Sequence, residues 1–256
     1  MTTRDGARLM GWTMHSMAPR DPGPPAAESA ARHAAVRAVI FDLDGVLVWS
    51  VPMHWRAFER TFAAEGKPFP YEEYLRCGIG AARDEVIRQV LGDLPEPKLL
   101  LLMAEKERHV REYLCEKGLD AIPGSLDFVR AVRARQLKTA VASASRTPEL
   151  LLSAVDATSL FDVVIGRGSV TRSKPHPDIY LLAAESLGVS PGECLVVEDS
   201  PVGIEAARAA GMRVIAVTTT EPVSALARAT AVYASFADIP FEVWISERGL
   251  FPQDRR

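Results

Sequence analysis

Short apolar runs alternate with longer helical patterns along most of this 256-residue chain. The run Val36–Phe41 is apolar and β-branched and leads into Asp42–Gly45, which is typical of a buried parallel strand that enters a tight turn. Further strand-like runs lie at Thr139–Ala142, Val163–Ile165, Cys194–Val197 and Arg213–Val217. Strands that alternate with helices form βαβ units, so we expect an α/β fold with a parallel sheet.

Prolines and glycines mark the ends of two helical patterns between these strands. Pro177 begins one pattern and Gly188 ends it, and Pro201 and Gly211 delimit the other in the same way. This punctuation predicts two helices that connect successive strands of the sheet.

A long stretch without a convincing strand follows the first strand and has helical periodicity. It predicts an inserted α-helical cap domain at residues 52–118, within a Rossmann-like core of residues 37–51 and 119–256. Residues 1–36 lack periodic large hydrophobes, and their second half is rich in Pro and Ala, so we expect a flexible N-terminal tail there.

Composition and charge argue against several classes of protein. Apolar residues make up 48% of the chain, which suffices for a sizeable core. No apolar run approaches the roughly 20 residues of a transmembrane helix. The net charge of −3 gives no basic footprint for nucleic acid. Three cysteines, none spaced as C-x-x-C, argue against a disulfide framework, so we expect a cytoplasmic protein.

Candidate catalytic side chains follow the strands at their carboxyl ends, where an open parallel sheet binds ligands. They are Asp42, Asp44, Ser143, Lys174, Glu198 and Asp199. Carboxylates at close range repel one another unless a cation joins them. Oxygen ligands with open positions suit Mg²⁺ shared with a substrate phosphate. We therefore predict a Mg²⁺ site at Asp42 and Asp199, with Glu198 as a further candidate.

Each of these groups also has an ordinary interpretation. Asp-x-Asp-Gly alone is a common turn, and a lone lysine such as Lys174 is usually a solvated charge. The occurrence of all these groups at strand ends favours a catalytic site. Of Asp42 and Asp44, one aspartate could attack while the other moves a proton. Lys174 and a serine hydroxyl would then hold phosphoryl oxygens.

Four motifs in this order resemble the haloacid dehalogenase superfamily, in particular its subfamily I phosphatases and β-phosphoglucomutase-like members. They are FDLDGVLV (Phe41–Val48), VASAS (Val141–Ser145), SKPHPDIY (Ser173–Tyr180) and LVVEDSPVGIEAARAAG (Leu195–Gly211). The resemblance implies a Mg²⁺-dependent phosphatase that hydrolyses a small phosphorylated metabolite, a sugar or polyol phosphate, through an aspartyl-phosphate. A β-phosphoglucomutase-like sugar phosphate mutase is the alternative.

The resemblance also implies roles for individual residues. Asp42 would be the nucleophile and Asp44 the general acid and base. Ser143 and Lys174 would hold the phosphoryl group. The implied metal ligands are Asp42, the backbone carbonyl of Asp44, and Asp199, with Glu198 beside them.

Three further positions concern the substrate and the cap. His54 falls in a His-x-x-Ala stretch where the family's histidine helps orient the acid/base aspartate, and Arg83 falls near a cap arginine that grips a second phosphate. Ser145 is a further candidate. Alternatively, His54 caps the first cap helix and Arg83 is a surface charge.

One departure from the family pattern leaves the substrate open. Trp49–Val51 replaces the common Asp-Ser-Glu at the cap hinge, so the choice between phosphatase and mutase is not decided. Asp44 argues against haloalkanoate dehalogenation and phosphonate hydrolysis, which use no acid/base aspartate at that position. The intact set of catalytic residues argues against a purely binding protein. The expected partner is a small phosphorylated metabolite, without nucleic acid or membrane.

Overall fold

A computed structural model describes residues 34–79 and 81–245 of the chain. The predicted tail, residues 1–36, falls outside this part except for its last three residues. Within the described residues, six parallel strands form one sheet in the order β3-β2-β1-β4-β5-β6. The strands are β1 (Ala38–Phe41), β2 (Lys138–Ala142), β3 (Val163–Ile165), β4 (Cys194–Glu198), β5 (Arg213–Val217) and β6 (Ala231–Tyr233). The predicted α/β fold with a parallel sheet is confirmed.

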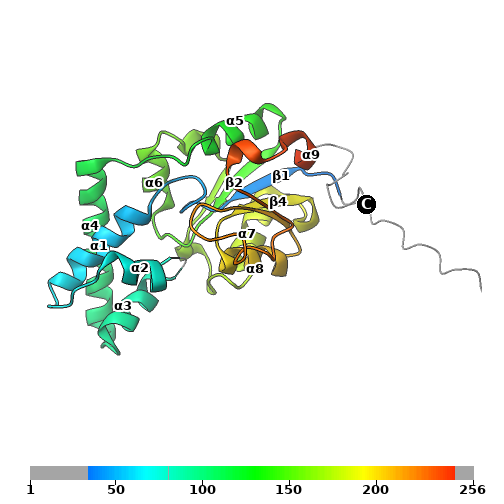
Figure 1. Cartoon of the computed structure of the whole chain (residues 1–256). Helices are drawn as coiled ribbons and strands as arrows, with labels where there is room; N and C mark the ends of the chain where they lie inside the picture. Colours follow the sequence, from blue (N-terminus) through cyan, green and yellow to red (C-terminus); the bar gives the residue numbers. More distant parts are fainter. Residues whose placement is uncertain (1–33, 80, 246–256) are drawn as a thin grey trace, which may run out of the picture. The chain divides into compact units, whose positions relative to one another are not determined.

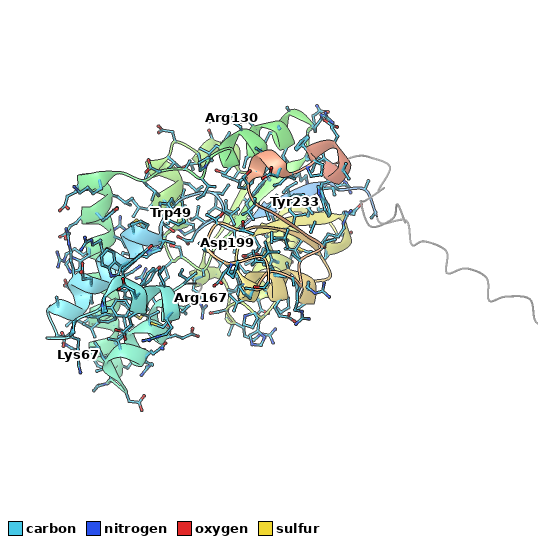
Figure 2. The ribbon with its side chains drawn as sticks, viewed as in Figure 1. Trp49, Lys67, Arg130, Arg167, Asp199 and Tyr233 are labelled. Atoms are coloured by element: carbon cyan, nitrogen blue, oxygen red, sulfur yellow. The ribbon has the colours of Figure 1, made fainter. Side chains whose placement is uncertain are left out.

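Among the described residues, the first four of the five helices between β1 and β2 lie in residues 51–117, which we call the helical insert. They are α1 (Val51–Ala63), α2 (Tyr71–Cys77), α3 (Arg83–Leu91) and α4 (Glu96–Lys117). The insert has its own apolar core, in which Phe62 packs edge-on against Phe69 with ring centroids 4.9 Å apart. Trp49 packs against this core and also against the core of the sheet, at the junction of the two (Figure 2).

The remaining helices cover the two faces of the sheet. They are α5 (Ser125–Ala134), α6 (Pro148–Ala154), α7 (Asp178–Leu187), α8 (Pro201–Ala209) and α9 (Phe241–Ile245), with short 3₁₀ helices η1 (Thr158–Leu160), η2 (Arg167–Ser169), η3 (Pro191–Glu193) and η4 (Phe236–Asp238). Figure 1 shows α5 and α9 on one side of the sheet and α7 and α8 on the other.

Alternation along β1 explains this layering. Val39 and Phe41 pack with residues of α5, α6 and α9, whereas Ala38 and Ile40 pack with residues of α7 and α8. Successive strand side chains point to opposite faces, so a strand covered on both faces must be apolar at every position. This is why the sequence of β1 is continuously apolar.

The connections of the insert run beside each other at the carboxyl end of β1. The Trp49 N–H donates to the Asp120 carbonyl over 2.8 Å, and Val48 forms an antiparallel bridge to Ala121. The two ends of the insert are therefore joined by backbone hydrogen bonds beside the first motif.

The last strand was not predicted from the sequence. β6 has only three residues, all half-buried, so it offers neither a fully apolar run nor a clear alternation. None of the described helices is long and apolar enough to cross a membrane.

Candidate active site

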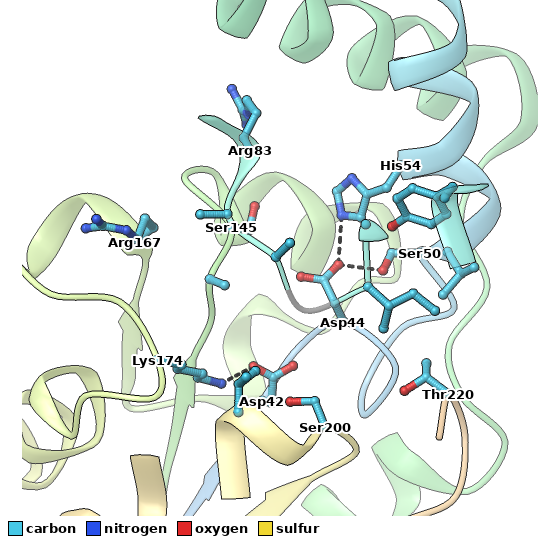
Figure 3. A pocket seen from close by; sticks show the side chains of 18 of the residues that line it. Asp42, Asp44, Ser50, His54, Arg83, Ser145, Arg167, Lys174, Ser200 and Thr220 are labelled. Carbon is cyan, nitrogen blue, oxygen red and sulfur yellow. Dashed lines mark hydrogen bonds and ion pairs between the residues drawn. The ribbon is translucent and has the colours of Figure 1, made fainter. Parts of the chain in front are cut away.

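A pocket lies between the carboxyl end of the sheet and the helical insert. The core contributes side chains that follow β1, β2 and β4, and the insert contributes residues of α1 to α4 (Figure 3). Predicted residues that line it are Asp42, Asp44, His54, Arg83, Ser145, Lys174 and Asp199. Distant parts of the sequence meet here because parallel strands end at the same edge of the sheet.

Lys174 joins two buried carboxylates at the centre of the site. Its Nζ donates to Asp42 Oδ1 over 2.5 Å and to Glu198 Oε1 over 2.7 Å. Burial raises the pKa of Asp42 to about 7, while the positive charge of Lys174 opposes this rise. Burial alone would lower the pKa of Lys174, but the charges of Asp42 and Glu198 raise it well above its ordinary value. Lys174 is thus a fixed positive charge beside Asp42.

Glu198 is fully buried, and both of its carboxylate oxygens are occupied. Oε1 accepts from Lys174 and from the Tyr180 hydroxyl, the latter over 2.7 Å. Oε2 accepts from the backbone N–H groups of Asp199 and Ser200 and from the Ser200 hydroxyl. The predicted metal-ligand role of Glu198 does not fit this geometry, because neither oxygen is left for an ion. Its position suits holding Lys174 in place.

Asp44 has a different set of partners on the side of the insert. Its Oδ1 accepts from the Ser50 hydroxyl over 2.5 Å and lies 2.9 Å from His54 Nε2, as the dashed lines in Figure 3 show. Burial alone would raise the pKa of Asp44, but His54, Ser50 and the more distant Lys106 lower it to about 2. Two aspartates two residues apart therefore occupy separate electrostatic environments.

Lys106 was missed by the sequence reasoning. It comes from α4, is 4% exposed, and its Nζ lies 2.8 Å from His54 Nδ1. An ionised Asp44 on Nε2 and a lysine donor on Nδ1 are compatible with a neutral histidine that carries its proton on Nε2. The signal was available, because Lys106 lies in the apolar stripe of α4 with Leu99, Met103 and Val110.

The two serines after β2 have unequal positions. Ser143 is fully buried, and its hydroxyl accepts from the Ser145 N–H over 2.9 Å and lies 3.5 Å from Asp44 Oδ2. Ser145 lines the pocket, and its hydroxyl accepts from the Thr147 N–H. Ser143 therefore packs beneath the pocket floor, and Ser145 is the one that reaches the pocket.

Asp199 follows β4 and lies close to the turn after β1. Its Oδ2 accepts from the Thr220 hydroxyl over 2.5 Å. A Cβ at Gly45 would lie 2.0 Å from the same oxygen, and Gly45 also has a φ of +79°. Only glycine suits both constraints. Thr220 and the role of Gly45 at this contact were not predicted.

The donor set fits a hard divalent cation. Burial and the charges of Glu198 and Asp42 raise the pKa of Asp199 well above its ordinary value, and Lys174, which is bonded to Asp42 and Glu198, opposes this rise only in part. Among residues 34–79 and 81–245, the side-chain hydrogen bonds of Asp42 and Asp199 engage Oδ1 and Oδ2 respectively, which leaves the other oxygen of each carboxylate for an ion. Within the same residues, no three His, Cys, Asp or Glu side chains form a ready cluster. Mg²⁺ needs only one or two carboxylates when phosphate and water complete its shell.

Arg83 lies at the rim of the pocket on α3. Its Nη1 donates to the Met103 carbonyl over 3.0 Å and to Glu107 over 3.3 Å. Burial lowers the pKa of Arg83, and the nearby positive charge of Arg146 lowers it further. Arg146 and Arg167 also line the pocket and were not predicted, because isolated arginines carry no local signal.

Comparison with known proteins gives consistent matches. The family model "haloacid dehalogenase-like hydrolase" matches residues 36–211. Protein CbbY of Rhodobacter capsulatus is 33% identical over 191 residues, which cover 70% of this chain and 84% of that protein. Phosphoglycolate phosphatase of Escherichia coli is 32% identical over 206 residues, which cover 72% and 81%. The crystal structure of β-phosphoglucomutase from Clostridium difficile superposes with a TM-score of 0.75 at 26% identity and covers 84% of this chain and 97% of that chain.

Proposed function

Because this chain belongs to the haloacid dehalogenase-like hydrolase family, we propose that it is a Mg²⁺-dependent phosphatase of small phosphorylated metabolites. The observation that carries this proposal is the separation of two neighbouring aspartates. Asp42 is bonded to Lys174, and Asp44 is bonded to Ser50 and His54. Two carboxyl groups in different environments suit a nucleophile and a proton carrier.

In the proposed reaction, an Asp42 oxygen attacks the phosphorus of the substrate. The bond from phosphorus to the ester oxygen breaks, and an aspartyl-phosphate forms on Asp42. Lys174 offsets the negative charge on the phosphoryl oxygens, and Glu198 keeps its ammonium group in position. Water then attacks the aspartyl-phosphate and releases inorganic phosphate.

Asp44 carries the proton in both steps of this proposal. Without substrate it is ionised, because its pKa is about 2. The negative charge of a phosphate ester beside it raises that pKa and favours the protonated form that the leaving oxygen needs. Ser50 and His54 hold the carboxyl group in one orientation.

Asp42 and Asp199 are the residues that would hold Mg²⁺ here, together with the backbone carbonyl of Asp44. When bound, the ion neutralises the adjacent carboxylates and phosphoryl oxygens, so that an anionic nucleophile can approach an anionic substrate.

Two arginines at the rim of the pocket support the proposal that the substrate carries a second anionic group. Arg83 and Arg146 place two positive charges near each other, although Arg83 already shares its Nη1 with Glu107. Phosphoglycolate carries such a second anion, and phosphoglycolate phosphatase is one of the relatives of this chain. We therefore favour a sugar or polyol phosphate with a second acidic group.

The nucleophile can be tested with Asp42→Asn. Phosphate release from p-nitrophenyl phosphate in Mg²⁺ is expected to fall by about a thousandfold or more, because the amide is a poor nucleophile and cannot form a stable phosphoryl ester. The exposed change Asp93→Asn is the matched control and should keep wild-type turnover. Wild-type turnover in Asp42→Asn would exclude Asp42 as the nucleophile.

A mutase remains the second candidate, because β-phosphoglucomutase shares the fold of this chain. The two activities differ in whether water or a sugar hydroxyl receives the phosphoryl group. Incubation with β-glucose 1-phosphate and a trace of glucose 1,6-bisphosphate separates them. We expect inorganic phosphate as the product, whereas glucose 6-phosphate without free phosphate would identify a mutase.

A further inference from the structure

Tyr74 presents a hydroxyl group that the proposed reaction does not use. The residue lies on α2 of the helical insert, is 3% exposed, and lines the same pocket as Asp44. Among the described residues, none makes a hydrogen bond to this hydroxyl. The hydroxyl oxygen is not among the fully buried side-chain atoms that lack a partner, so it opens to the pocket, where a bound ligand can form a hydrogen bond with it.

The ring of Tyr74 is held in place by its surroundings. It packs against Phe58 and Phe69, with ring centroids 6.2 Å and 6.3 Å away. On another side it occupies the space next to Gly78, where a Cβ would lie 2.2 Å and 2.4 Å from two ring carbons. Gly78 has an ordinary φ of −105°, so the ring contact, and not the backbone, requires glycine there.

The hydroxyl of Tyr74 is a neutral group beside Asp44. Burial raises the pKa of Tyr74 above its ordinary value, and the negative charge of Asp44 acts in the same direction. The hydroxyl therefore keeps its proton and can both donate and accept a hydrogen bond. In the proposed reaction Asp44 faces the ester oxygen, so a group beside Asp44 faces the first carbon atoms of the leaving alcohol.

Resting on the proposed phosphatase function, we propose that Tyr74 determines specificity by a hydrogen bond to a substrate hydroxyl on the carbon next to the phosphate-bearing carbon. Polyol and sugar phosphates carry this hydroxyl, and simple alkyl phosphates do not. A pocket that forms a hydrogen bond with a substrate hydroxyl discriminates against an analogue without it, because the bound analogue covers the protein hydroxyl and leaves it without a partner.

Two phosphate esters that differ in this one hydroxyl test the assignment. Glycerol 1-phosphate carries it, and 3-hydroxypropyl phosphate lacks it. The wild-type protein is expected to prefer glycerol 1-phosphate. In Tyr74→Phe the ratio of the two kcat/KM values should fall about threefold to tenfold, the size of one neutral hydrogen bond, chiefly through KM for glycerol 1-phosphate.

A second variant and a control separate the hydroxyl from general packing. Gly78→Ala keeps the hydroxyl but displaces the ring, so it should lower the same ratio. Tyr71→Phe is the matched control, because Tyr71 lies on the same helix, packs against Trp55 and does not line the pocket. Its ratio should equal that of the wild-type protein.

The outcomes distinguish the two proposals. An unchanged ratio in Tyr74→Phe, or a wild-type protein that hydrolyses both esters without preference, overturns the assignment of Tyr74 alone. Hydrolysis of p-nitrophenyl phosphate but of neither ester overturns it as well. A wild-type protein that releases phosphate from none of these three compounds and not from phosphoglycolate, all in Mg²⁺, overturns the proposed function itself.

Discussion

Lys106 is a charged residue buried in an apolar environment. It is a lysine in the apolar stripe of α4, with its ammonium group 2.8 Å from His54 and 4.9 Å from the centre of the Phe58 ring. Burial and the positive charge of Arg83 lower its pKa to about 7, while Asp44 and Glu107 oppose the change. Burying a charge costs free energy. The buried Lys106 also donates a hydrogen bond to His54 and so orients the histidine against Asp44.

We expect Lys106 to make folding stability depend on pH. Its pKa is about 7 when folded and about 10.5 when unfolded, so the unfolded chain binds the proton more tightly. The penalty for burying the ammonium is therefore fully present below pH 7 and declines as the pH rises towards 10.5. Relative to Lys106→Met, the wild-type protein should gain a few kcal/mol of unfolding free energy across this range, about 5 at most.

Urea unfolding at a series of pH values between 6 and 10 measures this difference. Lys67→Met, which changes an exposed lysine of the same insert, is the control and should leave the pH dependence unaltered. A difference between Lys106→Met and wild type that stays constant with pH would contradict the expected protonation change.

At the scale of elements, the packing of the first turn of α8 against the end of β4 fixes the position of Glu198, a residue of the candidate site. Ser200 accepts from the Gly203 N–H over 3.2 Å and so caps α8, while its hydroxyl donates to Glu198. The first turn of α8 passes so close to Glu198 that a Cβ at Gly203 would lie 1.6 Å from Oε1. The helix start therefore sets the position of Glu198 and, through it, of Lys174.

Gly203→Ala should damage both stability and activity. The added methyl group has to displace the Glu198 carboxylate, which we expect to cost about 1–3 kcal/mol of unfolding free energy. Phosphate release from p-nitrophenyl phosphate should fall at least about tenfold, because Lys174 loses its anchor. Gly192→Ala, where no atom lies within 4 Å of the added Cβ, is the control for denaturation and activity assays. Unchanged activity in Gly203→Ala would show that Glu198 does not position Lys174.

Within residues 34–79 and 81–245, the site depends on two structural units. The sheet supplies Asp42, Lys174 and Asp199 at the ends of its strands, whereas the insert supplies His54 and Lys106. The insert packs around its own apolar core and is tied to the sheet beside Asp44. Ligands that bind at the strand ends therefore stabilise the core directly, and contacts with the insert add to this effect.

Mg²⁺ and inorganic phosphate together should raise the midpoint of thermal unfolding by about 5 °C at saturating concentrations, because both bind only the folded protein. Asp199→Asn should lose most of this shift, since it removes a carboxylate that would hold the ion. Asp93→Asn, an exposed change, should keep it. Differential scanning fluorimetry with Mg²⁺ present or chelated measures the shift, and an equal shift in Asp199→Asn would exclude Asp199 as a ligand.

The sequence by itself determined the family, the parallel sheet and the residues at its strand ends. These features follow from local patterns, because a continuous apolar run predicts a buried strand and the strand ends carry the motifs of Asp42, Lys174 and Asp199. Tertiary structure alone decided the surroundings of Glu198, Lys106 and Tyr74. These surroundings depend on segments far apart in the chain: Glu198 contacts Lys174, Lys106 contacts His54, and Tyr74 lines the same pocket as Asp44. The position of Lys106 in the apolar stripe of α4 is visible in the sequence, but the partners of these residues are not, since such contacts arise only when distant segments pack together.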